Sequence, residues 1–274
     1  MLRYRMGCLW VSLLRRLGSE RSPGQGRGVA QPGRDYGDGG WRTAAGRRAM
    51  ESMSDRPIPH PRPSTPRLRG RLHQAAFLAS IPAGVALLVA AGSGRARLAA
   101  LVYAVSLAAM FGTSAALHRR RWSARAWLRM DRLDRAMIYV LIAGSYTPVI
   151  LLALRPGWRV AFLTLVWTVA AAGIVLVLLR TANPVLGLTR MVLYLGLGWT
   201  SVLLLPQLVG TLGLGKVSLA MVGGLFYTAG VVVLVRRRPD PVPQVFGYHE
   251  VWHAFTVAAG VCHFALIWQL AAAG

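Results

Sequence analysis

Seven long apolar segments, separated by short polar connections, make up the chain after residue 72. Each is close to the roughly 20 residues that an α-helix needs to cross the hydrocarbon core of a bilayer. The pattern therefore predicts an all-α, polytopic membrane protein, a bundle of seven transmembrane helices over residues 73–271. The predicted helices are His73–Ala91, Arg97–His118, Leu133–Leu154, Trp158–Leu179, Thr189–Val209, Val217–Val235 and Tyr248–Ala271.

The first 72 residues differ from the rest, because they lack a sustained apolar period and are rich in Arg, Gly, Pro and Ser. A segment of this composition cannot bury enough apolar surface to fold, so we expect residues 1–72 to be a disordered, basic cytoplasmic tail. Met1–Leu17 is compatible with a targeting segment or a surface helix, but it lacks the long apolar core of a secretory signal. Met50 and Met53 leave open a later translation start and a shorter tail.

Composition agrees with a membrane protein, since 54% of the 274 residues are hydrophobic and the mean hydropathy is +0.45. The net charge of +23 raises the question of nucleic acid. The basic residues, however, flank apolar segments and do not form a soluble face. We therefore expect anionic lipid head groups as partners, and no nucleic acid. Cys8 and Cys262 are far apart and imply no disulfide framework.

The basic residues are distributed unevenly between the connections. The even connections carry twelve, whereas the odd ones carry five. By the positive-inside rule, the N-terminus is then cytoplasmic and the C-terminus outside, in a multi-pass protein of the cell (plasma) membrane. The twelve are Arg119, Arg120, Arg121, Arg125, Arg129, Arg132, Arg135, Arg180, Arg190, Arg236, Arg237 and Arg238.

Three separated segments carry candidate metal chemistry. His249 and His253 are four residues apart on one helix face, an arrangement that suits zinc. The predicted topology brings His118 and Asp134 to the same membrane depth, and Ser114 shares the face of His118 and could orient His118 or Asp134. The hypothesis is that the three histidines bind Zn²⁺ with a fourth position open to water, and that Asp134 and Ser114 are the candidate catalytic residues. Alternatively, the histidines are ordinary polar residues of buried helices.

The stretch from His249 to His253 also matches H-E-x-x-H, in which the glutamate, here Glu250, is the general base of a zinc protease. His263 lies about 15 Å from His253 along a continuous helix and cannot easily complete such a site. Glu250 points about 100° away from the histidine face, so we expect it to meet basic partners instead.

Two further signals are weak. Gly210–Val217 approaches a phosphate-binding loop, but Val217 replaces the required Ser or Thr. His60 and His73 are expected to be exposed or juxtamembrane and to carry no chemistry.

The ordered motifs resemble the hemolysin III branch of the progestin and adipoQ receptor family. The resemblance covers about residues 70–274 and rests on Ser114-Ala-Ala-Leu-His118, Asp134, Gly144-Ser-Tyr-Thr-Pro148 and His249-Glu-Val-Trp-His253, followed by His263. It implies a seven-helix fold with a zinc site near the cytoplasmic face. It also implies that the three histidines bind zinc, that the aspartate holds a water at the metal, and that His263 is not a ligand.

The pattern leaves three functions to consider, and it does not favour them equally. The first is a zinc-dependent hydrolase of a lipid amide or ester, such as a ceramidase-like amidohydrolase, with Asp134 accepting a proton. The second is a lipid- or partner-sensing receptor with structural zinc, although such sites normally have four protein ligands. The third is a pore-forming cytolysin, which the polytopic layout disfavours.

Overall fold

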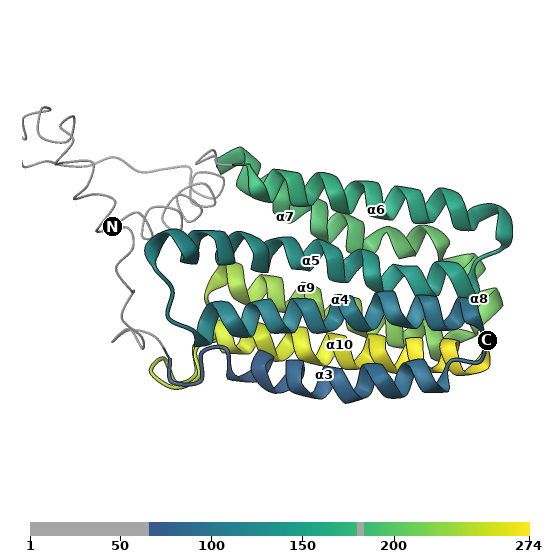
Figure 1. Ribbon diagram of the computed structural model, residues 1–274. Helices are drawn as coiled ribbons and strands as arrows, with labels where there is room; N and C mark the ends of the chain where they lie inside the picture. The colour runs from purple at the N-terminus through teal and green to yellow at the C-terminus, as the bar shows by residue number, and fades with distance from the viewer. Residues whose placement is uncertain (1–65, 180–183) are drawn as a thin grey trace, which may run out of the picture.

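The computed structural model describes residues 66–179 and 184–274, which form a bundle of long antiparallel helices (Figure 1). Seven segments of this described part are long and apolar enough to cross a membrane, so the predicted all-α, seven-span fold is confirmed. Of the tail expected over residues 1–72, residues 1–65 lie outside the described residues, whereas residues 66–70 lead through a turn into α3, which begins at Arg71. The helices are α3 (Arg71–Ala90), α4 (Gly94–Arg119), α5 (Ala124–Ala153), α6 (Pro156–Leu178), α7 (Pro184–Trp199), η1 (Thr200–Leu204), α8 (Leu205–Leu212), α9 (Leu214–Arg236) and α10 (Tyr248–Ala273).

Helix α5 begins well before the predicted start at Leu133. The hydroxyl of Ser123 accepts a hydrogen bond from the backbone of Ala126 and caps the helix at this earlier point. One helical turn separates Asp131 from Arg135, whose guanidinium nitrogen Nε lies 3.2 Å from the aspartate. A hydropathy criterion misses these turns because their arginines place them beyond the apolar segment.

The predicted fifth span, Thr189–Val209, is confirmed as the apolar segment Thr189–Leu212, but this segment is not one continuous α-helix. The segment is interrupted by the 3₁₀ turn η1 between α7 and α8. Pro206 has no N–H to donate within α8, which favours a break just before it. The Tyr146 hydroxyl of α5 donates to the carbonyl of Gly198 and accepts the N–H of Ser201, each at 2.8 Å. A side chain from another helix thus satisfies the backbone groups that the break frees.

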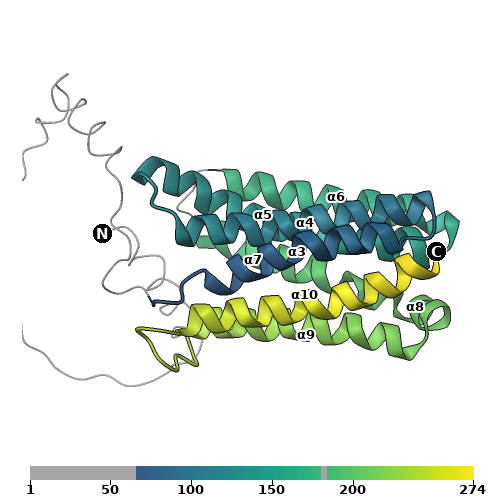
Figure 2. The ribbon, with the colours of Figure 1, turned by 60° about the horizontal axis from the view of Figure 1, so that its bottom comes forward.

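Helix α4 packs against α3 on one side and α5 on the other, and α10 contacts α3, α4, α5 and α9 (Figures 1 and 2). Close approach of α4 and α5 depends on Gly144, since a Cβ there would overlap the Ser106 side chain. One buried core lies among α3, α4, α5 and α10, and a second lies among α5 to α9. The first core includes Phe111, whose ring contacts that of His73 in the first turn of α3.

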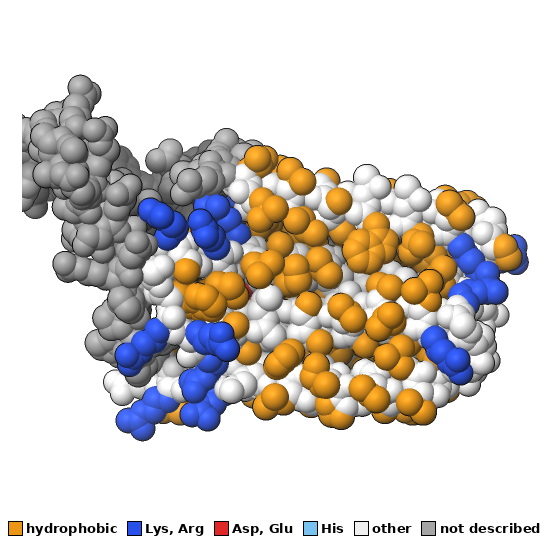
Figure 3. All heavy atoms as spheres, viewed as in Figure 1, with side chains coloured by type: hydrophobic (Ala, Val, Ile, Leu, Met, Phe, Trp, Pro, Cys, Tyr) orange, Lys and Arg blue, Asp and Glu red, His pale blue; other side chains and the backbone are white. Residues whose placement is uncertain are grey.

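Arginines gather at one end of the bundle, and apolar side chains cover its middle (Figure 3). The helices alternate in direction, so this end holds the N-termini of α3, α5 and α10 and the C-terminus of α4. We call it the arginine-rich end. The C-terminus of the chain lies at the opposite end (Figure 2).

Candidate metal centre

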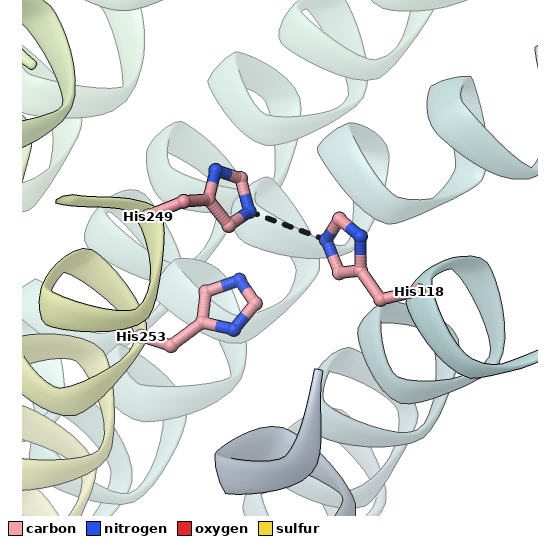
Figure 4. A group of neighbouring side chains, drawn as sticks. All are labelled: His118, His249 and His253. Atoms are coloured by element: carbon pink, nitrogen blue, oxygen red, sulfur yellow. Dashed lines mark hydrogen bonds between the residues drawn. The ribbon is translucent and has the colours of Figure 1, made fainter. Parts of the chain in front are cut away.

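Three histidines meet at the arginine-rich end. His118 comes from the last turn of α4, and His249 and His253 come from the first two turns of α10 (Figure 4). One ring nitrogen from each lies within 4.8 Å of the other two. His253 is buried, at 2% exposure, and the other two are half-buried. Residues far apart in the chain therefore converge on one point, as the topology argument expected.

The spacing of these nitrogens suits a metal ion. The Nε2 atoms of His118 and His249 lie 3.3 Å apart, and the two rings meet at 80°. Two nitrogens bound to one tetrahedral zinc at about 2.0–2.1 Å would be separated by about 3.3–3.4 Å. The pair from His118 and His249 therefore already has the spacing of two zinc ligands, and the three imidazoles together could hold a metal ion.

The two candidate catalytic residues lie together beside this centre. Ser114 is one turn before His118 on α4 and is 2% exposed. Its hydroxyl interacts with the side chain of Asp134, which is half-buried in α5. Of the two partners expected for Ser114, Asp134 is near enough to be influenced by its hydroxyl, whereas the contact of that hydroxyl at 2.8 Å is with Nδ1 of His73.

Glu250 has structural partners instead of a free carboxylate. One oxygen accepts the backbone N–H of Gly247 at 2.9 Å, which caps the start of α10. The other lies 2.6 Å from Nε of Arg69, just before α3. The expectation of a basic partner is confirmed, and a carboxylate held on both oxygens is poorly suited to act as a protease base. The ion pair also ties the start of α3 to the start of α10.

His263 lies elsewhere on α10. Its Nε2 is 3.3 Å from the carbonyl of Ala220 on α9, and its ring is 5.6 Å from that of Tyr227. It borders a mostly apolar cavity of about 150 Å³ between α5, α7, α9 and α10. Trp252, which precedes His253, and Thr256, three residues after His253, also border this cavity. The cavity therefore begins on the same helix turns that carry the metal centre.

His73 was expected to be exposed or juxtamembrane and to carry no chemistry; it lies in the first turn of α3, at the end of the first span, but it is buried. It is 2% exposed, its Nδ1 lies 2.8 Å from the Ser114 hydroxyl, and its ring stacks on His253 at 3.8 Å. The topology argument that grouped His118 with Asp134 applies equally to the first turn of α3. That signal was available in the sequence, but no motif accompanied it.

Comparison with known proteins gives consistent matches. The sequence model of the Haemolysin-III related family matches residues 62–264. The Hemolysin-3 homolog of Bacillus subtilis (strain 168) is 29% identical over 195 residues, covering 70% of this chain and 87% of that protein. Hemolysin-3 of Bacillus cereus is 30% identical over 197 residues, covering 70% and 85%. The human monocyte to macrophage differentiation factor is 28% identical over 178 residues, covering 63% and 70%.

Proposed function

Because the chain belongs to the Haemolysin-III related family, the hemolysin III branch of the progestin and adipoQ receptors, we propose that it is a zinc-dependent hydrolase of a lipid amide or ester bond. It is a multi-pass membrane protein, and we assign it to the plasma membrane with the arginine-rich end in the cytoplasm.

The observation that carries the proposal is the convergence of His118, His249 and His253 next to Asp134 and Ser114. Three imidazoles with one position left for water or substrate are typical of catalytic zinc, whereas structural zinc sites are normally closed by four protein ligands. Imidazole also binds copper, iron and nickel, but zinc adds no redox chemistry to a hydrolytic site. Zinc is therefore the metal that best fits this donor set.

In the proposed reaction, zinc bound by the three histidines would polarise the substrate carbonyl and make water more acidic. The Asp134 carboxylate accepts the proton of the attacking water and returns it to the leaving amine or alkoxide. The Ser114 hydroxyl donates to Asp134 and holds its carboxylate in one orientation. In this reaction Asp134 is the base, whereas Glu250 only caps the start of α10.

The apolar cavity supports a lipid substrate. It is bordered by Trp252 and Thr256, the residues of α10 next to and near His253. A cavity with mostly apolar walls and few polar groups is suited to an acyl chain. The cavity is lined by Trp252 and not by His253, so the scissile bond of such a lipid would have to extend past Trp252 to reach the three histidines.

A receptor with structural zinc is the alternative, and it makes a different prediction for Asp134. In a receptor, Asp134 would bind the metal directly and close the site, and no bond would be broken. The name of the Bacillus cereus relative, Hemolysin-3, describes that protein and not this chain. A cytolysin is a poorer candidate for this chain, because its seven apolar helices suit permanent insertion.

The test combines metal analysis with lipid turnover on protein purified in detergent. We expect about one zinc per chain in the wild type and its loss in His118→Ala and His253→Ala. Asp134→Asn should retain zinc but lower the hydrolysis of a panel of ceramides and lipid esters by at least about 100-fold. Glu250→Gln is the matched carboxylate control and should retain both zinc and most turnover.

Two outcomes would contradict the proposal. Intact zinc without hydrolysis across the panel would favour the receptor. Loss of turnover in Glu250→Gln but not in Asp134→Asn would favour the zinc-protease arrangement instead.

A further inference from the structure

His73 is held in the first turn of α3 by contacts with two parts of the metal centre. Its Nδ1 lies 2.8 Å from the Ser114 hydroxyl of α4. Its ring lies parallel to that of His253 in α10, with 3.8 Å between centroids and 11° between planes. Phe111 contacts the ring edge-on at 5.1 Å. Three contacts on a buried side chain leave His73 little freedom to change orientation.

The stacking excludes His73 as a ligand of the ion that His253 would bind. A metal bound to an imidazole nitrogen lies close to the plane of the ring. Two stacked rings only 11° from parallel have planes that meet far beyond any bonding distance. By contrast, the rings of His118 and His249 are at 51° and 62° to that of His253, so all three planes can share one nearby point. His73 therefore supports the ligand set from outside.

The donors and acceptors available at His73, Ser114 and Asp134 give the hydrogen bond between His73 and Ser114 a direction. A serine hydroxyl has one proton, and an ionised carboxylate only accepts. If Ser114 donates to Asp134, it must accept from His73, which then carries its proton on Nδ1. A chain runs from His73 through Ser114 to Asp134, from α3 through α4 to α5. Three of the four helices that meet at the site contribute one member each, and the fourth, α10, carries His249 and His253.

We propose that His73 is a positioning residue with two separable actions: its ring fixes the plane of His253, and its Nδ1–H orients the Ser114 hydroxyl toward Asp134. The first action concerns metal binding alone. The second rests on the proposed function, because it gives Asp134 its role as base. The two actions use different features of the imidazole and can be removed one at a time.

Three substitutions separate the actions. His73→Phe keeps a flat ring to stack on His253 but loses the donor. His73→Asn keeps an N–H donor at the position of Nδ1 but loses the ring. His73→Ala removes both. His263→Phe is the matched control, since it makes the same change at another histidine, ten residues from His253 on α10.

Cobalt(II) is the probe of the metal centre, because its visible absorption reports ligand number and geometry without any turnover. We expect His73→Phe to keep the wild-type cobalt spectrum and a Kd within about threefold. His73→Asn should weaken cobalt binding by about tenfold or more and shift the spectrum, as is typical when support around a ligand is lost. His73→Ala should behave like His73→Asn, and His263→Phe like the wild type.

Lipid turnover tests the second action. His73→Phe should lower kcat to the level of Ser114→Ala while KM changes little, and His73→Asn saturated with metal should recover part of kcat. A thermal unfolding curve for each variant identifies any that fails to fold. If His73→Ala fails to fold, His73→Phe and His73→Asn still test the two actions separately.

Three results would overturn the proposal. An unchanged cobalt spectrum and Kd in both His73→Asn and His73→Ala would show that the ring does not orient His253. Loss of a nitrogen ligand in His73→Phe would make His73 a ligand. Wild-type kcat in His73→Phe would remove the second action. If the wild type hydrolyses no lipid, the proposed function fails, while the cobalt measurements still decide the role of His73 in metal binding.

Discussion

At the scale of the residue, Gly70 controls how closely the chain before α3 approaches the metal centre. Its φ is +76°, a conformation that residues with a side chain rarely adopt. A Cβ at this position would lie only 2.6 Å from the Cβ of His118. Both the backbone angle and the space therefore require glycine, and any side chain here would push against a candidate ligand.

We predict that Gly70→Ala weakens zinc or cobalt binding by about tenfold, because displacement of His118 disturbs the ligand geometry. Metal titration of the purified protein measures the effect. Gly213→Ala is the control, since Gly213 also has φ +76° but has no neighbour within 4 Å of an added Cβ. An equal loss of affinity in the control would attribute the effect to general backbone strain, and the argument about His118 would be wrong.

At the scale of the element, the interrupted fifth span depends on a hydroxyl from α5. The Tyr146 hydroxyl satisfies both a carbonyl of α7 and an N–H of η1. Backbone groups left without partners in an apolar environment are costly, so the break needs a polar group from a neighbouring helix. Tyr146 lies within the motif Gly144–Pro148, one of those on which the family resemblance rests. Its hydroxyl adds a specific role to that motif.

We predict that Tyr146→Phe lowers the free energy of unfolding by about 1–3 kcal/mol, the usual cost of leaving buried polar groups unpaired. Thermal unfolding in detergent measures it as a lower Tm. The control is Tyr194→Phe. Within the described residues, 66–179 and 184–274, the Tyr194 hydroxyl makes no hydrogen bond, and the Tyr194 ring packs against that of Tyr139. Equal Tm losses in the two variants would contradict the role of the Tyr146 hydroxyl.

At the scale of the whole molecule, charge divides the bundle into two unlike ends. The arginine-rich end carries the candidate metal centre, and the opposite end has few basic residues (Figure 3). Anionic lipids of the cytoplasmic leaflet attract arginines that flank membrane helices. This asymmetry favours a cytoplasmic metal centre, so a substrate would reach the histidines from the inner leaflet.

We predict that a cysteine at Val242, an exposed residue between α9 and α10 at the arginine-rich end, reacts with a membrane-impermeant maleimide only after the cells are permeabilised. A cysteine at Gly157, at the start of α6 and at the opposite end, should react in intact cells. Both changes are made in a Cys8→Ser, Cys262→Ser background. The reverse pattern would place the metal centre outside the cytoplasm and refute the charge argument.

Much of the fold was predictable because hydropathy is a local property. A run of about 20 apolar residues forms a membrane-spanning helix whatever its neighbours are, and the alternating direction of successive spans follows from the count. The same logic predicts that His118, Asp134 and the two histidines of α10 lie at one depth. The segment Ala124–Arg132 was not predicted as helix, because a capped, arginine-rich helix gives no hydropathy signal.

The sequence by itself therefore determined the number of membrane spans, their helical character and the end of the bundle at which each candidate ligand is expected. Only the tertiary structure decided which side chains touch. His118 and His249 are 131 residues apart, and His73 and Ser114 are 41 apart. The stack of His73 on His253 and the bonds from Tyr146 to the broken span arise where helices pack at particular rotations. Rotation about a helix axis is set by the fit of many side chains together, and no single stretch of sequence encodes it.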